Sequence, residues 1–300
     1  MPFRRKILSK IVRRYQHWRN DLRNNSRLYK DARGCRILIY HGICQEDPTR
    51  YNAIFLRQKT FETQLKYYTE YFNVISLDDY YHQRFRDDKF NICLTFDDGF
   101  ANNHKYVLPL LEQYQIPATF FVTGIRDAGF DILWNDFLAI VSPADAKSLR
   151  ATGFDAKREI MQALQPYWPS DINDDYWLQM TPEQIRELSA SPFATICCHG
   201  YYHNDLAQIP TQDAVKEMIQ SKRYLEAITG TSVHAMAFPY GSYSPAVITE
   251  AKAIGFDQLL AMDFLYPEDY TDPAMRERLT MNPFISVHNQ LYAIISGKYE

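Results

Sequence analysis

The sequence is poor in cysteine and has no long uninterrupted hydrophobic run. Its five cysteines include no pair at the CxxC spacing that is common in zinc and redox motifs. We interpret them as reduced core thiols in a reducing compartment, since a disulfide framework does not fit this usage. The sequence contains no run of about 18 apolar residues, which a transmembrane helix would need, and no apolar signal-peptide core follows the charged N-terminus. The sequence therefore predicts a cytoplasmic protein, with peripheral contact at the inner face of the membrane as an option.

Charge is unevenly distributed along the chain, although the net charge is only −3. Residues 1–36 contain twelve Lys and Arg and two Asp and Glu, so the remainder of the chain carries about −13. Apolar and aromatic residues recur at near-helical spacing through residues 1–30, which predicts a basic amphipathic N-terminal helix within an arm at residues 1–35. Three roles stay open for this arm: packing on the outside of the body, docking a partner, or contact with an anionic membrane. Because the body is acidic, no nucleic acid partner is expected.

From residue 36 onward, strand-like and helix-like segments alternate, which is typical of an α/β protein with parallel strands and helical crossovers. The segments that we predict as strands are 37–40, 74–75, 92–96, 118–122, 193–198, 234–238, 256–262 and 284–287. Residues 125–190 interrupt the alternation and hold three of the four tryptophans, so we predict an inserted helical segment there. The remaining body, residues 36–300, is predicted to form one domain.

Polar side chains follow several of these strands. The buried run at 92–96 ends in two adjacent acids, Asp97 and Asp98, whose like charges are costly side by side unless a cation is bound. His199 and His203 follow the strand at 193–198 with a spacing that brings both imidazoles to one side of a helical turn. Because the C-terminal ends of parallel strands form one face, we expect these groups to meet. Two histidines and one carboxylate make a three-ligand metal site with open positions.

These motifs, taken in order, resemble those of the polysaccharide deacetylases that contain a NodB-homology domain. The resemblance rests on Thr95–Gly99 (TFDDG), on His199 and His203, on Phe238–Gly241 (FPYG), and on Tyr40–Gly42 (YHG). It covers roughly residues 36–290, and the first two motifs are the specific ones. It implies a distorted (β/α)7-type barrel and the hydrolysis of an N-acetyl group, or sometimes an O-acetyl group, on a carbohydrate.

The resemblance also implies roles for individual residues. Asp97 is expected to be the general base, and Asp98 is expected to bind a divalent metal with His199 and His203. Zn²⁺ is the default metal, while Co²⁺, Ni²⁺ and Fe²⁺ are alternatives. The backbone N–H of Tyr240 is expected to help stabilise the oxyanion.

Two roles are not assigned by the motifs. The general acid could be His41 or His288, and a water-mediated or substrate-assisted route is a third option. Many members of the family carry an arginine that orients the base two residues before the proline of the third motif, and Ala237 occupies that position here. In relatives with the YHG segment, an arginine often precedes the last strand, where we find Phe284. We therefore expect either that another group holds Asp97 or that Asp97 is poorly oriented.

The leading hypothesis is a metal-dependent deacetylase acting in the cytoplasm on a glycan or on a lipid- or nucleotide-linked sugar intermediate. The alternative is a catalytically weak or inactive barrel that binds a glycan or a partner enzyme, and it is motivated by the missing arginine.

Overall fold

The computed structural model describes residues 17, 21, 25–50, 52–170 and 174–299. Most of the predicted N-terminal arm lies outside these residues, so its helix stays a prediction. All five cysteines are free thiols, and four of them are buried, which confirms that they are not paired as disulfides. None of the helices in the described ranges is long and apolar enough to span a bilayer.

A parallel sheet forms the centre of the molecule, in the order β10–β9–β8–β7–β6–β5–β1–β11, with β4 pairing beside β5. Its strands are β1 (Gly34–Tyr40), β4 (Phe72–Val74), β5 (Phe90–Phe96), β6 (Ala118–Val122), β7 (Ala194–Cys198), β8 (Ala235–Ala237), β9 (Gln258–Leu260), β10 (Met275–Arg276) and β11 (Leu279–Thr280). A separate pair is formed by β2 (Ile43–Cys44) and β3 (Leu56–Arg57). Every strand pairing in the described residues is parallel, as the alternation predicts.

A single split strand closes this sheet into a barrel. Its first half, β10, pairs with β9 at one edge, and its second half, β11, pairs with β1 at the other edge. Only residues 277 and 278 separate the two halves, so the two edges of the sheet must meet there. Counting β10 and β11 as one position, the described strands that pair in the sheet order occupy seven positions, which is the predicted (β/α)7-type barrel.

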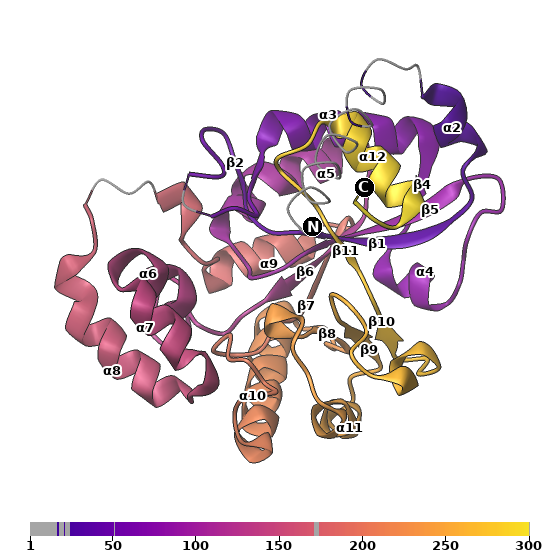
Figure 1. The fold of residues 1–300 in the computed structure, drawn as a ribbon. Helices are drawn as coiled ribbons and strands as arrows, with labels where there is room; N and C mark the ends of the chain where they lie inside the picture. Colours follow the sequence, from indigo (N-terminus) through magenta and orange to yellow (C-terminus); the bar gives the residue numbers. More distant parts are fainter. Residues whose placement is uncertain (1–16, 18–20, 22–24, 51, 171–173, 300) are drawn as a thin grey trace, which may run out of the picture.

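Helices cover the outside of the barrel (Figure 1). They are α2 (Ser26–Asp31), α3 (Gln58–Tyr71), α4 (Leu77–Tyr81), α5 (Leu108–Tyr114), α9 (Pro182–Ala190), α10 (Thr211–Thr229), α11 (Pro245–Ile254) and α12 (Val287–Ser296). A π-helical turn, Asn103–Val107, leads into α5. At the start of α9, the side chains of Thr181 and Gln184 form a reciprocal capping box.

Alternation along the strands separates two apolar clusters. Leu94 and Phe96 belong to the large cluster between the sheet and the helices, whereas Cys93 and Phe121 belong to a small cluster inside the barrel. Asp97 lies two residues beyond Thr95 and four beyond Cys93, so it continues the inward-facing series. The strand periodicity therefore delivers this carboxylate to the barrel interior.

Within residues 125–190, α9 packs on the barrel, whereas α6 (Trp134–Val141), α7 (Pro143–Ser148) and α8 (Phe154–Leu164) stand beside it in Figure 1. They share a third apolar cluster with residues from the loops around β2 and β3. Trp134, Phe137 and Phe154 are buried there, in the same cluster as Phe55. This cluster holds the inserted helices against the face where the strands end.

One predicted strand is wrong. Residues 284–287 do not form a strand; Phe284 is 68% exposed and α12 begins at Val287. The Ser286 side chain accepts a hydrogen bond from the backbone N–H of Asn289 and so caps the N-terminus of α12. The β-prone residues before this cap predicted a strand instead of a helix start. The last strand of the barrel is instead the short β11.

Candidate active site

The two adjacent carboxylates leave β5 in different directions. Asp97 is still bonded to the neighbouring strand, since its backbone N–H donates to the Tyr40 carbonyl at 2.9 Å. Asp98 and Gly99 follow with φ angles of 77° and 81°, a left-handed turn that ends the strand. A Cβ at Gly99 would lie 2.9 Å from Val122 Cγ1, so a side chain there would collide with β6. The turn therefore separates the two acids and gives each its own set of partners.

Asp97 forms a buried bidentate ion pair with Arg278. Arg278 Nη1 donates to Asp97 Oδ1 at 2.8 Å, and Nη2 donates to Oδ2 at 2.7 Å. The guanidinium is fully buried, and it also donates to Thr95 Oγ1 and to the Ala261 carbonyl. Burial acts to raise the pKa of Asp97, but the charges of Arg278 and His199 outweigh it and lower that pKa.

Arg278 resolves the expectation about a missing arginine. Position 237 is an alanine in β8, and position 284 lies in an exposed turn, so neither supplies a guanidinium. The arginine instead stands directly before β11, at the point where the split strand crosses between the two edges of the sheet. The sequence pattern predicts the last strand at 284–287, whereas β11 lies at Leu279–Thr280, so the arginine that precedes this strand is Arg278. Another group does hold Asp97, which was one of the two expectations.

Asp98, His199 and His203 form the second set. His199 Nε2 lies 3.3 Å and His203 Nε2 lies 3.1 Å from Asp98 Oδ1, and all three side chains are nearly inaccessible to solvent. One possible ligand atom from each residue lies within 4.8 Å of the others. Burial raises the pKa of Asp98, but hydrogen bonds from the two imidazoles reverse the effect and leave it well below the usual value.

The two histidines do not reach this position on a helical turn, as their spacing suggested. Residues 199–203 are an irregular loop, in which Gly200 and His203 have φ angles of 74° and 56°. Glu217 on α10 ties the loop down: its carboxylate accepts hydrogen bonds from the backbone N–H groups of Tyr202 and Asn204 and from the Asn204 side chain. A Cβ on Gly200 would lie 2.9 Å from that same carboxylate. The loop has to coil tightly, and a buried acid supplies the acceptors that a helix would otherwise provide.

The outer nitrogens of both imidazoles are hydrogen-bonded to acceptors. His199 Nδ1 lies 2.8 Å from the Ala237 carbonyl, and His203 Nδ1 lies 3.1 Å from Asn135 Oδ1. Each Nδ1 therefore donates its proton outward, so Nε2 is the nitrogen of each ring that faces Asp98 and that could bind a metal ion once it is deprotonated. Two imidazoles, each oriented by an outer acceptor, and one carboxylate match the donor set that divalent transition metals require. The residues present thus fit a metal ion.

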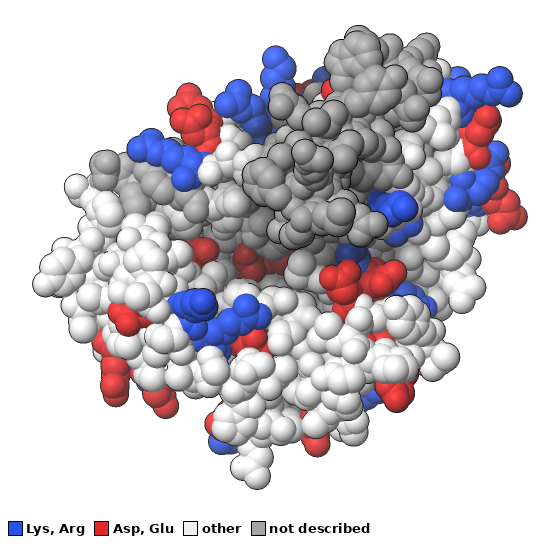
Figure 2. Space-filling model, in the orientation of Figure 1, with Lys and Arg blue, Asp and Glu red and all other residues white. Residues whose placement is uncertain are grey.

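A cavity of roughly 450 Å³ opens over this site, and the side chains that line it include Asp97, Asp98, His199 and His203. Figure 2 shows acidic side chains in the hollow at the middle of this face, with basic ones on its lower rim. Three further residues that line the cavity each have a buried polar atom without a hydrogen-bond partner: His41 Nδ1, Asp136 Oδ2 and Tyr240 Oη. Such atoms are rare in native interiors, so three around one cavity indicate that its occupant is polar.

His41 and Tyr240, both predicted, are brought to the cavity. Burial lowers the pKa of His41 against the opposing influence of Asp98. Tyr240 lies in the short helical turn after β8 with a φ of 61°, a left-handed conformation that is uncommon for an aromatic residue. The centroid of its ring lies 4.7 Å from that of His203 and 4.4 Å from the Arg150 guanidinium carbon, which stands over the ring.

His288 is not brought to this site. It lies on α12, where its Nδ1 is 3.2 Å from Tyr29 Oη and its Nε2 is 3.5 Å from Tyr67 Oη, and it does not line the cavity. Its partners come from α2 and α3 on the outside of the barrel. The structure therefore places His288 in a packing role and leaves His41 as the candidate that reaches the cavity.

The inserted helices contribute residues that sequence reasoning missed. Asn135, Asp136 and Arg150 all line the cavity, and Trp134 Nε1 donates to the His203 carbonyl at 2.9 Å. Burial and the nearby charge of Asp98 raise the pKa of Asp136 well above its usual value. No motif marks these residues; the only signal was the concentration of tryptophans in the segment.

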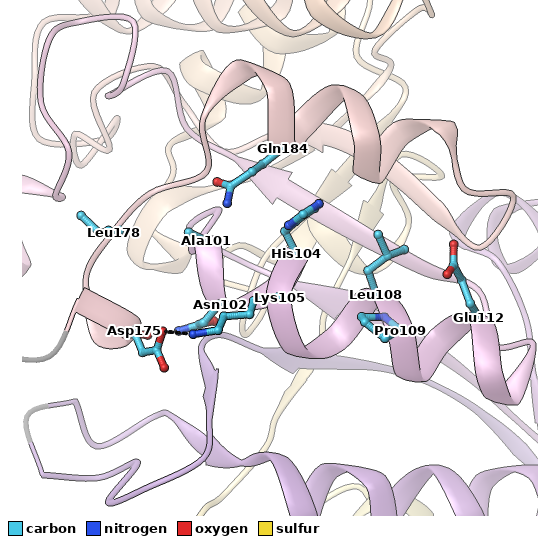
Figure 3. Close-up of a pocket in the computed structure, with 10 residues that line it drawn as sticks. All are labelled: Ala101, Asn102, His104, Lys105, Leu108, Pro109, Glu112, Asp175, Leu178 and Gln184. Carbon is cyan, nitrogen blue, oxygen red and sulfur yellow. Dashed lines mark hydrogen bonds and ion pairs between the residues drawn. The ribbon is translucent and has the colours of Figure 1, made fainter.

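A second hollow, of roughly 480 Å³, lies away from this chemistry (Figure 3). His104 and Lys105, from the π-helical turn, stand on one side of it, and Gln184 from α9 stands opposite. Two of its charged side chains are already paired, as Lys105 bonds to Asp175 at 2.8 Å and His104 to Glu187 at 2.9 Å. The two hollows are similar in volume, and the convergent ligands favour the other one as the candidate site.

Comparison with known proteins agrees with the fold and the motifs. A family model described as polysaccharide deacetylase matches residues 86–259, which is more than half of the chain. The chain therefore belongs to the polysaccharide deacetylase family, whose members are hydrolases that act on N-acetyl groups of carbohydrates.

Particular relatives can be named. The poly-beta-1,6-N-acetyl-D-glucosamine N-deacetylase of Escherichia coli (strain K12) is 21% identical over 235 residues, which make up 69% of this chain and 30% of that protein. This chain thus matches less than a third of the length of that relative. Streptococcus pyogenes deacetylase PplD, solved in complex with acetate, superposes with a TM-score of 0.63 at 20% identity and covers 87% of this chain and 97% of that one. IcaB from Ammonifex degensii gives 0.57 at 18% identity, covering 84% and 94%. These structures share the barrel fold.

Proposed function

We propose that this chain is a metal-dependent hydrolase that removes an N-acetyl group from a carbohydrate. The proposal rests on the presence of two acids with different partners in one cavity. Asp98 lies beside His199 and His203, and Asp97 forms a bidentate ion pair with Arg278. Membership of the deacetylase family supports the reaction type.

Asp98, His199 and His203 would hold the metal. Zn²⁺ is the first candidate for this donor set, and Co²⁺, Ni²⁺ or Fe²⁺ are compatible with it. When bound, the ion supplies Lewis acidity, which polarises the acetyl carbonyl and acidifies water.

Asp97 is the general base. Its lowered pKa keeps it ionised at neutral pH, so it can accept a proton while the water oxygen attacks the acetyl carbon. Arg278 fixes both carboxylate oxygens and so fixes the direction in which the base points. The backbone N–H of Tyr240 is the protein's own donor to the developing oxyanion, a type of contact worth about 3–4 kcal/mol in other enzymes.

The C–N bond then breaks and the departing amine takes up a proton. His41 is the candidate for that transfer because it lines the cavity and its Nδ1 has no partner. Its lowered pKa means that the imidazole starts neutral, so the proton that it passes on must first come from the reaction. The proton that Asp97 removed from water can pass to His41 and from there to the departing amine, so no proton is gained or lost.

The substrate is an acetylated carbohydrate. Asp136 and Arg150, on the inserted side of the cavity, would accept from and donate to hydroxyl groups of the sugar. The name of the E. coli relative supports an N-acetylglucosamine unit. We propose that the reaction takes place in the cytoplasm, on a glycan or on a lipid- or nucleotide-linked sugar, and that the basic arm at residues 1–30 is the segment that would contact an anionic membrane face. The alternative, an inactive barrel that binds a glycan or a partner, was suggested by a missing arginine. Arg278 supplies that arginine, so the alternative is no longer supported by this absence.

The test is acetate release from acetylated amino-sugar glycans by the metal-loaded protein and by its Asp97→Asn variant. The proposal expects the variant to keep its metal and to lose at least about 100-fold in turnover, since general-base catalysis contributes about that much. Unchanged turnover in the variant, or no turnover by the unaltered protein on any such glycan, would refute it.

A further inference from the structure

The two histidines of the candidate metal site are supported by different parts of the molecule. His199 follows β7 directly and donates its Nδ1–H to the Ala237 carbonyl of the adjacent strand β8. The barrel itself therefore orients His199. His203 lies four residues farther along the loop, and none of the described hydrogen bonds joins its side chain to a strand.

The first residues of α6 take over that support. Asn135 Oδ1 lies 3.1 Å from His203 Nδ1, so it accepts the imidazole proton and fixes both the tautomer and the ring plane. The neighbouring Trp134 donates its indole N–H to the His203 carbonyl at 2.9 Å. The side chain and the backbone of one residue are thus held by two consecutive residues of the inserted segment.

The backbone of His203 is itself strained, so it needs support from its surroundings. His203 has a φ of 56°, a left-handed conformation that is strained for a non-glycine residue. Trp134 and His203 are 1% and 4% exposed, so water does not compete for their bond. The surrounding contacts must therefore stabilise the conformation, and Trp134 supplies one of them.

A buried charge extends the connection to α8. Lys157 is completely buried; its Nζ lies 4.0 Å above the Trp134 ring and donates to Asn204 Oδ1, next to His203. Asn204 in turn donates to the Glu217 carboxylate at 2.8 Å. Neither Lys157 nor Glu217 lines the cavity, so their burial is accounted for by holding this loop rather than by touching a substrate.

We propose that the inserted segment is part of the metal centre, with Asn135 and Trp134 as the positioning residues of His203. In this account, residues 125–190 set the affinity for the metal ion as well as forming one wall of the cavity. The inference rests on the metal site of the proposed function, because only a bound ion gives the orientation of His203 Nε2 a chemical consequence.

The experiment is an equilibrium titration of the full-length protein with Zn²⁺ in competition with a chromophoric chelator. Asn135→Leu removes the acceptor at similar volume, and we expect it to weaken Zn²⁺ binding by about 10- to 100-fold. Asn135→Asp keeps an acceptor and should bind Zn²⁺ at least as well as the unaltered protein. Trp134→Phe, which loses only the indole N–H, should show a smaller loss in the same direction.

Gln162→Leu is the matched control, since Gln162 is exposed on α8 and lies outside the cavity. It should leave Zn²⁺ binding unchanged. The visible absorption of the Co²⁺-loaded proteins provides a second readout, because a turned His203 alters the coordination geometry and a merely looser fold does not.

Equal Zn²⁺ affinity in Asn135→Leu and the unaltered protein would overturn the inference, as would an equal loss in Asn135→Leu and Asn135→Asp. If the unaltered protein binds none of Zn²⁺, Co²⁺, Ni²⁺ and Fe²⁺, the proposed function itself fails, and this inference fails with it. A loss confined to Asn135→Leu and Trp134→Phe supports both.

Discussion

The orientation of the catalytic base depends on one contact, the ion pair between Asp97 and Arg278. Both oxygens of the carboxylate are engaged, and neither side chain is appreciably exposed. A buried charge that loses its partner is strongly destabilising, because water cannot replace the lost contact. Arg278 therefore acts on stability and on chemistry at once.

Arg278→Gln should lower stability by about 3–5 kcal/mol, since it leaves Asp97 buried without its cation. It should also raise the pKa of Asp97, because the guanidinium that lowers this pKa is gone. Asp97 has to be ionised to act, so the acid limb of kcat/KM should move to higher pH. Thermal unfolding and a pH–rate profile measure the two effects.

Arg276→Gln is the control for that variant. Arg276 lies two residues earlier and packs over the Tyr81 ring, away from the cavity. An Arg276→Gln protein with the same displaced acid limb, or an Arg278→Gln protein with an unmoved one, would show that the pair does not tune the base.

Asp136 is a buried carboxyl that the protein leaves without a partner on one oxygen. Its pKa is raised, so the folded state holds this proton more tightly than the unfolded state does. The resulting stability cost is absent below the unfolded pKa of about 3.9 and grows as the pH rises toward the folded pKa. Asp136→Asn should therefore gain thermal stability over the unaltered protein progressively as the pH rises above about 4, until Asp136 ionises in the folded protein.

The same Asp136→Asn variant should raise KM more than it lowers kcat if the carboxyl binds the sugar. Asp155→Asn, at an exposed acid on α8, is the matched control and should change neither stability nor KM. A drop in stability in Asp136→Asn at every pH would assign Asp136 a structural role instead.

At the scale of elements, the site depends on how strands end. The separation of Asp97 from Asp98 follows from a left-handed turn after β5, and the convergence of His199 and His203 follows from a coiled loop after β7. Neither is a regular element, so each needs its own source of hydrogen-bond acceptors. For the loop after β7 that source is Glu217.

Glu217→Ala should unfold at a lower temperature than the unaltered protein and bind metal more weakly. It leaves the buried N–H groups of Tyr202 and Asn204 without their acceptor, at about 1–3 kcal/mol each. Thermal unfolding and Zn²⁺ titration measure the two effects. Asp213→Ala, an exposed acid on the same helix, should leave both unchanged; similar losses in the two variants would contradict the role given to Glu217.

The sequence predicted the elements with strong local signals and failed where the signal is not local. The predicted strand 118–122 coincides with β6, because a buried apolar run defines it within a few residues. The split strand could not be predicted, since β10 and β11 are two residues each and derive their geometry from pairing with distant edges. Arg278 was missed for that reason.

The candidate site divides in the same way. Asp97, Asp98, His199 and His203 stand in compact motifs, so their types and spacing identified them and the structure brings them together. Asn135 contributes through a contact with His203, 68 residues farther along the chain, which no local pattern records. His288 had the expected residue type but sits among tyrosines on the outer side of the barrel.

At the scale of the whole molecule, the barrel and the family are established, while the cellular site of action remains a prediction. The charge asymmetry of the sequence predicts that residues 1–36 bind an anionic surface. The full chain should therefore be retained on anionic liposomes in a salt-sensitive manner and should not be retained on DNA. Retention on DNA alone would favour a nucleic acid partner, and retention on neither would leave the arm as a packing or docking element.

The central claim is that Asp98, His199 and His203 form a metal site, and the metal content of the purified protein tests it most directly. After equilibration with Zn²⁺ and removal of free ion, we predict about one equivalent per chain, and a marked loss in Asp98→Asn. Less than about half an equivalent in the unaltered protein, not restored by added Zn²⁺, would contradict the account.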